Sequence, residues 1–401
     1  MSKLAIRSEL DKLGWSLGLD PDAVGYLDQV PAEQLRSLRV AIYDLLYRED
    51  RVLFRRMAAV AERLPIGLTL QVAGRLGPLL TAKVATEMPA GRGAEVASRM
   101  STTFAADVCV ELDPRRTRDL IAHLPTTWTV AVALELARRG DVVTMSRFVD
   151  FVADDAVRGV VEAIEDEAAL LRVAFYMGSK NRMDHFFGML PPKRLEALIL
   201  RVEDEPDELL PALLSLLIHV SYSLKRQLGD IAAAQDESVL TGYVRATQRQ
   251  DLWADILPVV GAMSEPCRRK VVNLPILGEL GVQERIVRAA DDHGLWVVVL
   301  PLVELMNGTT RATMAGIMAA RDHATLRGAG DAALMGEQWD ALLDLAALMP
   351  QAKQDELAVI VQSLGEVDPA LLRRVADGAS RRGFGDRFDV SGVSPTPGGT
   401  A

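Results

Sequence analysis

The amino-acid sequence predicts an all-α fold, a superhelical array (solenoid) of short antiparallel helices of about 12–13 residues each. The composition is 49% hydrophobic but only 5% aromatic, so the interior must be built from Ala, Leu, Val, Ile and Met. With Arg and Glu also prominent, this mixture is rich in helix formers. Cap and breaker residues recur at nearly equal steps, and most of the pieces between them end on apolar residues. That order is expected for short helices entered from tight turns.

The regular spacing is clearest between residues 113 and 202. Pieces begin at residues 113, 125, 141, 153, 165, 178 and 191, and each has Asp, Pro, Gly or Ser within its first two positions. Pairs of such helices repeat about every 25 residues, a period within the range of helical solenoids.

The stretch TTWTVAVALELARRG (126–140) has large apolar residues that alternate, a pattern typical of a half-buried strand. Its Ala, Leu and Glu residues are strong helix formers, Pro and Thr precede them, and Arg-Arg-Gly ends the stretch, so we expect a helix. Burial on most sides explains the alternation. The same reasoning predicts a buried helix at LWVVVL (295–300), with Pro301 near its start.

The rest of the chain follows the same pattern. Longer pieces precede residue 113, at 31–50 and 51–65, and Leu-Pro breaks are expected at Leu257-Pro258 and Leu274-Pro275. We expect an N-terminal helical region at 1–87, either a cap of the array or a separate interaction module, and a helical-repeat superhelix at 88–383. Residues 384–401 are rich in Pro, Gly and Ser and are predicted to form a disordered tail.

Charge and hydropathy exclude some classes of function. The formal net charge of -10 argues against general binding of nucleic acid or anionic lipid, although Arg115, Arg116 and Arg118 form a local basic patch. The longest apolar runs are too short to span a bilayer, so no transmembrane segment is expected. The two cysteines, Cys109 and Cys267, form no CxxC pair, which fits a reducing compartment. We therefore expect a cytoplasmic protein.

Three segments share a Leu or Met, then Pro, a few polar residues and an apolar helix: MPAGRGAEVASRM (88–100), LPPKRLEALILRV (190–202) and MPQAKQDELAVIV (349–361). These units resemble the helical repeats in the N-terminal cytosolic domain of MgtE-type magnesium transporters, and related units occur in flagellar motor switch proteins. The resemblance implies a helical superhelix. It does not imply magnesium transport, because the chain lacks the nucleotide-binding-like domains and membrane helices of those transporters.

Aromatic residues gather in the middle of the chain and have two interpretations. They form the core between stacked repeats, or they line a groove or internal pocket for an apolar ligand or a partner helix. Together with nearby polar residues, the candidates for ligand or partner binding are Phe148, Phe151, Phe175, Tyr176, His185, Phe186, Phe187, His219 and Tyr222.

No motif points to catalysis, a cofactor or a metal. None of the five histidines stands three or four residues from another His or a Cys, as helical chelation requires. The acidic clusters at 162–167 and 203–208 suit helix caps, with weak binding of hard cations as the alternative. The chain has no phosphate-binding GK[ST] loop and no GxSxG motif.

The sequence favours a non-catalytic scaffold or adaptor that binds a protein partner or another copy of itself. The first alternative is a carrier or sensor of a hydrophobic small molecule in an internal pocket. The second is an enzyme whose site carries no recognisable motif. Three structural features distinguish these alternatives. A scaffold should have an exposed apolar or charged patch, a carrier an enclosed dry cavity, and an enzyme a cleft that gathers several titratable groups.

Overall fold

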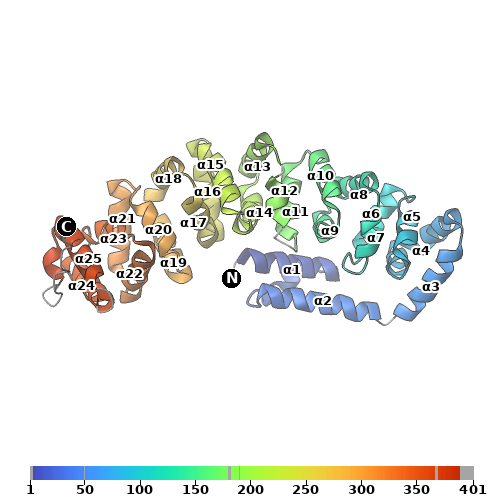
Figure 1. Ribbon diagram of the computed structural model, residues 1–401, viewed down its shortest axis with the longest axis horizontal. Helices are drawn as coiled ribbons and strands as arrows, with labels where there is room; N and C mark the ends of the chain where they lie inside the picture. The colour runs from blue at the N-terminus through green and yellow to red at the C-terminus, as the bar shows by residue number, and fades with distance from the viewer. Residues whose placement is uncertain (1–2, 49, 179–181, 189, 366–368, 389–401) are drawn as a thin grey trace, which may run out of the picture. The chain divides into compact units, whose positions relative to one another are not determined.

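The structure is a computed structural model that describes residues 3–48, 50–178, 182–188, 190–365 and 369–388. All regular elements within these ranges are helices, which confirms the predicted all-α helical array (Figure 1). The chain divides into two compact units, Met1–Ser221 and Tyr222–Ala401. The boundaries expected between the N-terminal region and the superhelix, at residues 87 and 88, and between the superhelix and the tail, at residues 383 and 384, stay predictions.

The first unit begins with a helical hairpin and continues as a stack of helices. Its elements are α1 (Lys3–Leu17), η1 (Pro21–Leu27), α2 (Ala32–Arg48), α3 (Arg51–Arg63), α4 (Ile66–Thr86), α5 (Ala90–Ala97), α6 (Thr102–Glu111), α7 (Arg118–Ala122), α8 (Thr126–Arg138), α9 (Val142–Phe148), α10 (Asp154–Ala163), α11 (Glu167–Tyr176), α12 (Met183–Gly188), α13 (Pro192–Asp204) and α14 (Pro206–His219). Helices α4, α6, α8 and α10 pack side by side in that order, while α5 packs on α7 and α9 on α11.

Five of the seven helices between residues 113 and 204 begin within two residues of a predicted start, whereas α7 and α12 begin five residues after the starts predicted at 113 and 178. Asp141 caps α9 by accepting a hydrogen bond from the Thr144 backbone N–H at 3.0 Å, and Asp166 caps α11 in the same way through Ala168. These side chains satisfy backbone donors that the first helical turn leaves unpaired. The stretch at 126–140 is indeed a helix, α8, and Val132 and Leu136 are its buried residues.

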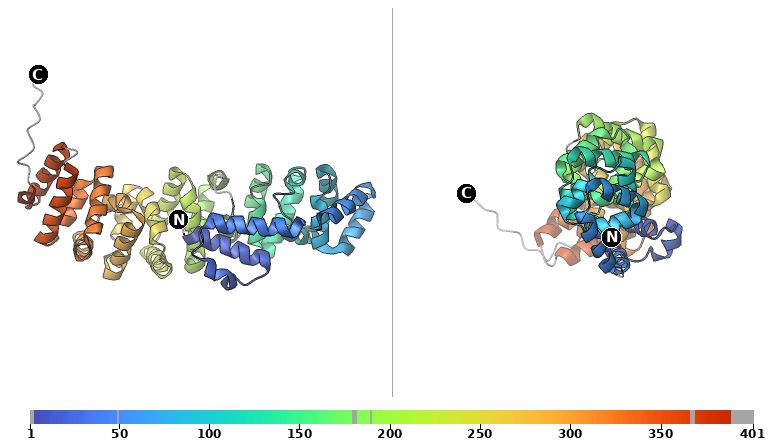
Figure 2. Two further views of the ribbon diagram at one scale, coloured as in Figure 1. Left: turned by 90° about the horizontal axis from the view of Figure 1, so that it is seen from below. Right: turned by 90° about the vertical axis from the view of Figure 1, so that its right-hand side faces the viewer.

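The N-terminal hairpin lies along the first unit and has a small core of its own (Figure 2). This core consists of Leu10, Leu13, Val24 and Leu35. Helix α1 packs against α11 and α14. There the Ser8 hydroxyl donates to the Phe175 carbonyl at 3.1 Å, and the Tyr176 hydroxyl donates to Asp11 at 3.1 Å. Polar contacts therefore fix α1 on the stack.

Basic side chains join successive layers by capping the carboxyl ends of earlier helices. Arg147 donates to the carbonyls of Val110 and Leu112 at 3.0 and 2.6 Å, at the carboxyl end of α6. Arg194 donates to Val161 and Ile164 at 2.9 and 2.8 Å, at the end of α10. A cation at a helix C-terminus also interacts favourably with the helix dipole, so each contact stabilises both a helix end and the stacking of layers.

The second unit repeats one three-helix motif. Its elements are α15 (Tyr222–Ala234), α16 (Glu237–Gln250), α17 (Trp253–Ala262), α18 (Glu265–Val272), η3 (Pro275–Gly278), α19 (Leu280–His293), α20 (Trp296–Val303), α21 (Gly308–Ala320), α22 (His323–Gly336), α23 (Trp339–Ala346), α24 (Gln351–Gly365), α25 (Pro369–Arg381) and η4 (Gly385–Arg387). Trp253, Trp296 and Trp339 each begin the second helix of a motif and are spaced 43 residues apart. The period expected from helix pairs, about 25 residues, does not describe this unit.

The turn before each of these tryptophans has the same unusual backbone. Asp251, Gly294 and Glu337 all adopt the left-handed conformation, with φ of 55°, 65° and 54°. A left-handed residue after the last helical turn lets its N–H bond back to the helix, as each of these three does. Of the three, only Gly294 is a glycine, the residue type that adopts this conformation without steric cost.

Two predictions about prolines were wrong. Pro258 does not break the chain between helices but lies inside α17, and Pro301 lies in the second half of α20 rather than near its start. Both helices begin five residues earlier, at a tryptophan, so the proline falls in the second helical turn, where it removes one backbone bond without ending the helix. The expected break at Pro275 is confirmed, since this residue begins η3.

Part of the predicted tail is described. Phe384 and Phe388 are buried, with their ring centroids 6.2 Å apart, and η4 lies between them. Residues 389–401 lie outside the described part of the chain.

Candidate functional site

The first unit contains an apolar cavity between its two layers of helices. Its volume is about 180 Å³, and side chains from α4 to α12 and from the end of α3 line it. Val108 of α6, Val132 and Leu136 of α8, Phe148 of α9 and Phe186 of α12 are among the lining residues. The cavity therefore runs along the stacking direction within this unit.

The amino-acid composition explains why the cavity remains. Positions that line the cavity on α4, α6 and α8 carry small residues, Ala73, Ala105 and Ala133, which leave space between the layers. Three threonines also line the cavity, but each hydroxyl donates to a backbone carbonyl: Thr69 to Pro65 at 3.2 Å, Thr81 to Ala73 at 3.1 Å and Thr129 to Pro125 at 3.2 Å. The lining therefore offers water few hydrogen-bond partners.

Cys109 is the only titratable residue among the described residues that line the cavity. Burial raises the pKa of its thiol to about 12, despite the opposing influence of Arg147. The thiol therefore stays protonated near neutral pH and is a poor nucleophile. The cavity has the chemistry of a binding site and lacks that of an acid–base or nucleophilic active site.

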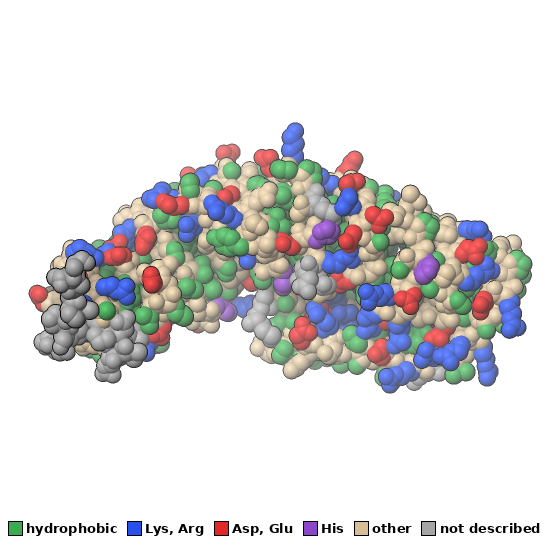
Figure 3. Space-filling view, viewed as in Figure 1, with side chains coloured by type: hydrophobic (Ala, Val, Ile, Leu, Met, Phe, Trp, Pro, Cys, Tyr) green, Lys and Arg blue, Asp and Glu red, His purple; other side chains and the backbone are tan. Residues whose placement is uncertain are grey.

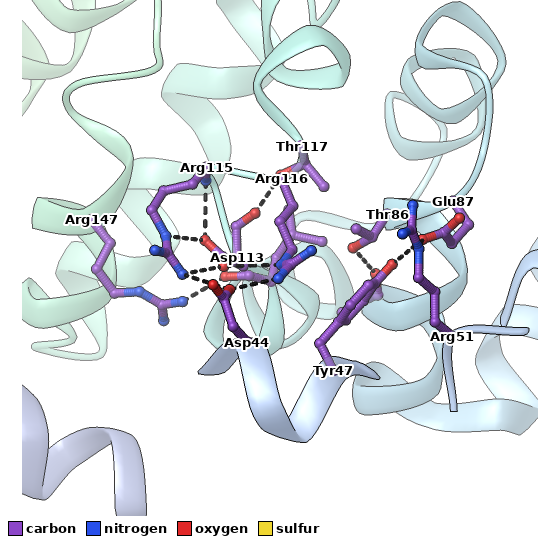
Figure 4. Close-up of polar contacts among 12 residues, drawn as sticks. Asp44, Tyr47, Arg51, Thr86, Glu87, Asp113, Arg115, Arg116, Thr117 and Arg147 are labelled. Carbon is purple, nitrogen blue, oxygen red and sulfur yellow. Dashed lines mark hydrogen bonds and ion pairs between the residues drawn. The ribbon is translucent and has the colours of Figure 1, made fainter. Parts of the chain in front are cut away.

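A second cavity, a cleft of about 390 Å³, lies where the hairpin meets the stack and differs in character. It is lined by five cations, Lys12, Arg36, Arg39, Arg115 and Arg147, and by two carboxylates, Asp113 and Asp150. Figure 4 shows Arg115, Arg116 and Arg147 gathered around Asp44 and Asp113. Lys and Arg side chains also cover much of the surface over α2 and α3 in Figure 3. We call this cavity the basic cleft.

Arg147 is held rigidly at the edge of the basic cleft. Its guanidinium lies 4.9 Å from the Trp15 ring centroid and 5.7 Å from that of Tyr43, within the range of cation–π contacts. Two of its N–H groups donate to the carbonyls of Val110 and Leu112 at the end of α6. Burial lowers the pKa of Arg147, but an arginine starts so high that it stays charged.

Glu9 organises the opposite wall of the basic cleft. Its buried carboxylate accepts hydrogen bonds from Lys12 at 2.5 Å, Arg39 at 3.0 Å and Arg36 at 3.3 Å. Burial alone raises the pKa of Glu9, but Lys12 and Arg39 outweigh it, so the pKa lies below its usual value. Burial lowers the pKa of Lys12, against the opposing charge of Glu9.

A second polar cluster holds α2 against α4 and the loop that follows it. The Tyr47 hydroxyl donates to Glu87, and Arg51 donates to the same carboxylate at 2.9 Å (Figure 4). Burial, reinforced by the bond to Glu87, raises the pKa of Tyr47 above its usual range. Tyr47 also lies under Arg116, 4.3 Å from ring centroid to guanidinium.

The predicted aromatic site does not form one pocket. Phe148 and Phe186 line the apolar cavity, whereas Phe151 and Tyr176 line the basic cleft. Phe187 is completely buried against Phe186, with ring centroids 5.0 Å apart.

The other candidate residues lie elsewhere. Phe175 is buried and packs edge-on against the Tyr176 ring at 5.0 Å. His185 is exposed, with its Nε2 3.6 Å from Asp154, and His219 Nδ1 lies 2.8 Å from the Ser215 carbonyl. Tyr222 is exposed at the start of the second unit.

The basic cleft contains residues that sequence reasoning missed. Of the local patch at residues 115–118, only Arg115 lines it, and Lys12, Arg36, Arg39 and Arg147 come from distant segments. No sequence spacing links these residues, because the packing of α1 and α2 on the stack brings them together.

Within the described ranges, no group of three His, Cys, Asp or Glu side chains is arranged to hold a metal ion. None of the helices in the described part of the chain is both long and apolar enough to cross a membrane. Comparisons with protein-family models, curated proteins and solved structures found no match. The resemblance to the transporter repeats therefore stays a prediction.

Proposed function

We propose that the chain is a non-catalytic helical-repeat protein whose first unit binds a hydrophobic small molecule. The observation that carries this proposal is the apolar cavity of about 180 Å³. An empty cavity is costly, at roughly 24 cal/mol per Å³, so this one destabilises the fold by about 4 kcal/mol when nothing fills it. An apolar ligand offsets that cost by restoring packing contacts.

The size of the cavity limits the ligand. An apolar cavity of roughly 150 Å³ holds benzene, so about 180 Å³ suits a compact molecule on the order of ten non-hydrogen atoms. Because the lining is almost entirely aliphatic and aromatic, the ligand contacts the protein through apolar surface. A cytoplasmic location belongs to the same proposal, since Cys109 and Cys267 are free thiols.

Two measurements test this proposal. Native mass spectrometry of protein purified from its own host detects a bound small molecule as extra mass that denaturation removes. Thermal unfolding with butylbenzene then tests the cavity directly, because linkage gives about 2.7 kcal/mol of stabilisation at a hundredfold excess over Kd. A bare chain whose melting temperature does not respond to butylbenzene would refute the proposal.

A surface feature supports a second candidate, a scaffold that associates with another copy of itself. Large apolar side chains are exposed on three helices at the start of the stack: Leu38, Leu45, Val52, Leu53, Val60, Leu68, Val72, Leu79 and Leu80. Exposed apolar side chains on neighbouring helices at the end of a solenoid are a candidate site of contact with another copy of the chain.

Sedimentation velocity tests the scaffold candidate through one variant and one control. Val60 and Val359 are equally exposed, at 61%, but only Val60 lies in the apolar surface described above. We expect the wild-type chain and Val359→Asp to sediment as dimers and Val60→Asp as a monomer. A monomeric wild-type chain at micromolar concentration rules out self-association through this surface.

A further inference from the structure

The basic cleft is electrostatically unusual for this protein. The chain has a formal net charge of -10, yet five cations and two carboxylates line this one cleft. A concave site in which one sign of charge predominates attracts ligands of the opposite sign. The charge of the cleft therefore points to an anionic ligand.

The arginines of the cleft have donors to spare. A guanidinium carries five N–H groups. Arg36 uses two of them, for Glu9 and Glu33, and Arg115 also uses two, both for Asp113. Within the described residues, the remaining N–H groups of both side chains make no hydrogen bond, although Arg115 also pairs with Asp44 at 3.9 Å. The existing ion pairs hold these side chains in place without exhausting their capacity to bind an anion.

The arrangement suits a phosphate better than a carboxylate. The cations approach from two walls, with Arg36 and Arg39 on α2 and Arg115 and Arg147 on the stack. A phosphate offers three acceptor oxygens and a charge of about -1.5 to -2, so it can bind donors on both walls at once. A carboxylate has two oxygens in one plane and a single charge.

The cleft also has apolar walls. Tyr43, Phe151 and Tyr176 line it beside the cations, and a volume of about 390 Å³ exceeds what one phosphate fills. Aromatic surface beside a phosphate site suits a ligand that carries a ring or another organic group.

We propose that the basic cleft binds a small organic phosphate. This proposal is independent of the hydrophobic ligand, because different residues line the two cavities and either site can be empty while the other is filled. Since the phosphate contacts both α2 and the stack, binding also stabilises the docking of the N-terminal hairpin.

The test uses isothermal titration calorimetry of the full chain with ADP, and with adenosine as the uncharged comparison. Arg36→Gln and Arg115→Gln each remove one cation from the cleft, and their side chains are 38% and 37% exposed, so both variants should fold. The control is Arg138→Gln in α8, because Arg138 also pairs with a carboxylate, Glu135, but does not line the cleft. Thermal melting verifies that each variant is folded.

We expect ADP to bind at least tenfold more tightly than adenosine. Each cleft variant should weaken ADP binding by about tenfold, the effect of losing one charge-assisted contact, and the control by less than twofold. Added salt should weaken ADP binding in all variants. Absence of ADP binding at millimolar concentration, equal affinity for adenosine, or an equal loss in Arg138→Gln would each overturn the proposal.

Discussion

Filling the apolar cavity from within should stabilise the protein and abolish ligand binding. Val132 lies on α8, which packs between α6 and α10, is only 4% exposed and lines the cavity. The change Val132→Phe enlarges an apolar side chain next to empty space. The empty cavity costs about 4 kcal/mol of stability, so a phenyl ring that fills about a quarter of its volume without strain should recover about 1 kcal/mol.

Thermal unfolding with and without butylbenzene measures both effects. Without ligand, a gain of about 1 kcal/mol raises the melting temperature by roughly 2–4 °C for a unit of this size. With ligand, the wild-type protein should gain stability while Val132→Phe gains little, because the phenyl ring occupies the space that the ligand needs.

Val132→Ala is the matched control, because it enlarges the same cavity. It should destabilise the protein by about 2 kcal/mol through two lost methyl groups and the added void, yet keep its response to butylbenzene. If Val132→Phe instead loses several kcal/mol, no usable space exists beside this residue. If it melts and responds like the wild type, the ligand binds elsewhere.

Three further changes test the structural reasoning. Replacing Asp251 or Glu337 with Gly should raise stability by about 0.5–1 kcal/mol each in chemical denaturation, because both residues adopt left-handed conformations that disfavour side chains. Glu9→Gln should cost about 3–5 kcal/mol by leaving buried cations unpaired. Since the pKa of Glu9 is lowered by folding, its contribution is present above its unfolded value and is lost as pH falls from about 5 to 3, as pH-dependent melting can show. Leu136→Asp should unfold the first unit by burying a carboxylate, whereas Leu134→Asp, at a half-buried position, should cost less by circular dichroism.

The sequence by itself determined the helices and many of their boundaries. Helix starts depend on residues within one turn, such as Asp141 and Asp166, so local chemistry predicts them. The 43-residue repeat was also present in the sequence, in the spacing of Trp253, Trp296 and Trp339. The prolines inside α17 and α20 obscure this repeat, because a proline ordinarily indicates a break or the start of a helix.

Only the tertiary structure decided where binding sites form. The apolar cavity is the volume that side chains leave unfilled between two layers of helices. This volume is a small difference between the space available and the summed side-chain volumes, so no local sequence pattern predicts it. The basic cleft depends on the docking of α1 and α2, which brings Lys12 and Arg36 beside Arg115 and Arg147 across more than 75 residues of chain. Hydrophobic periodicity says which face of a helix is buried, but the partner of that face is chosen by packing over long sequence distances.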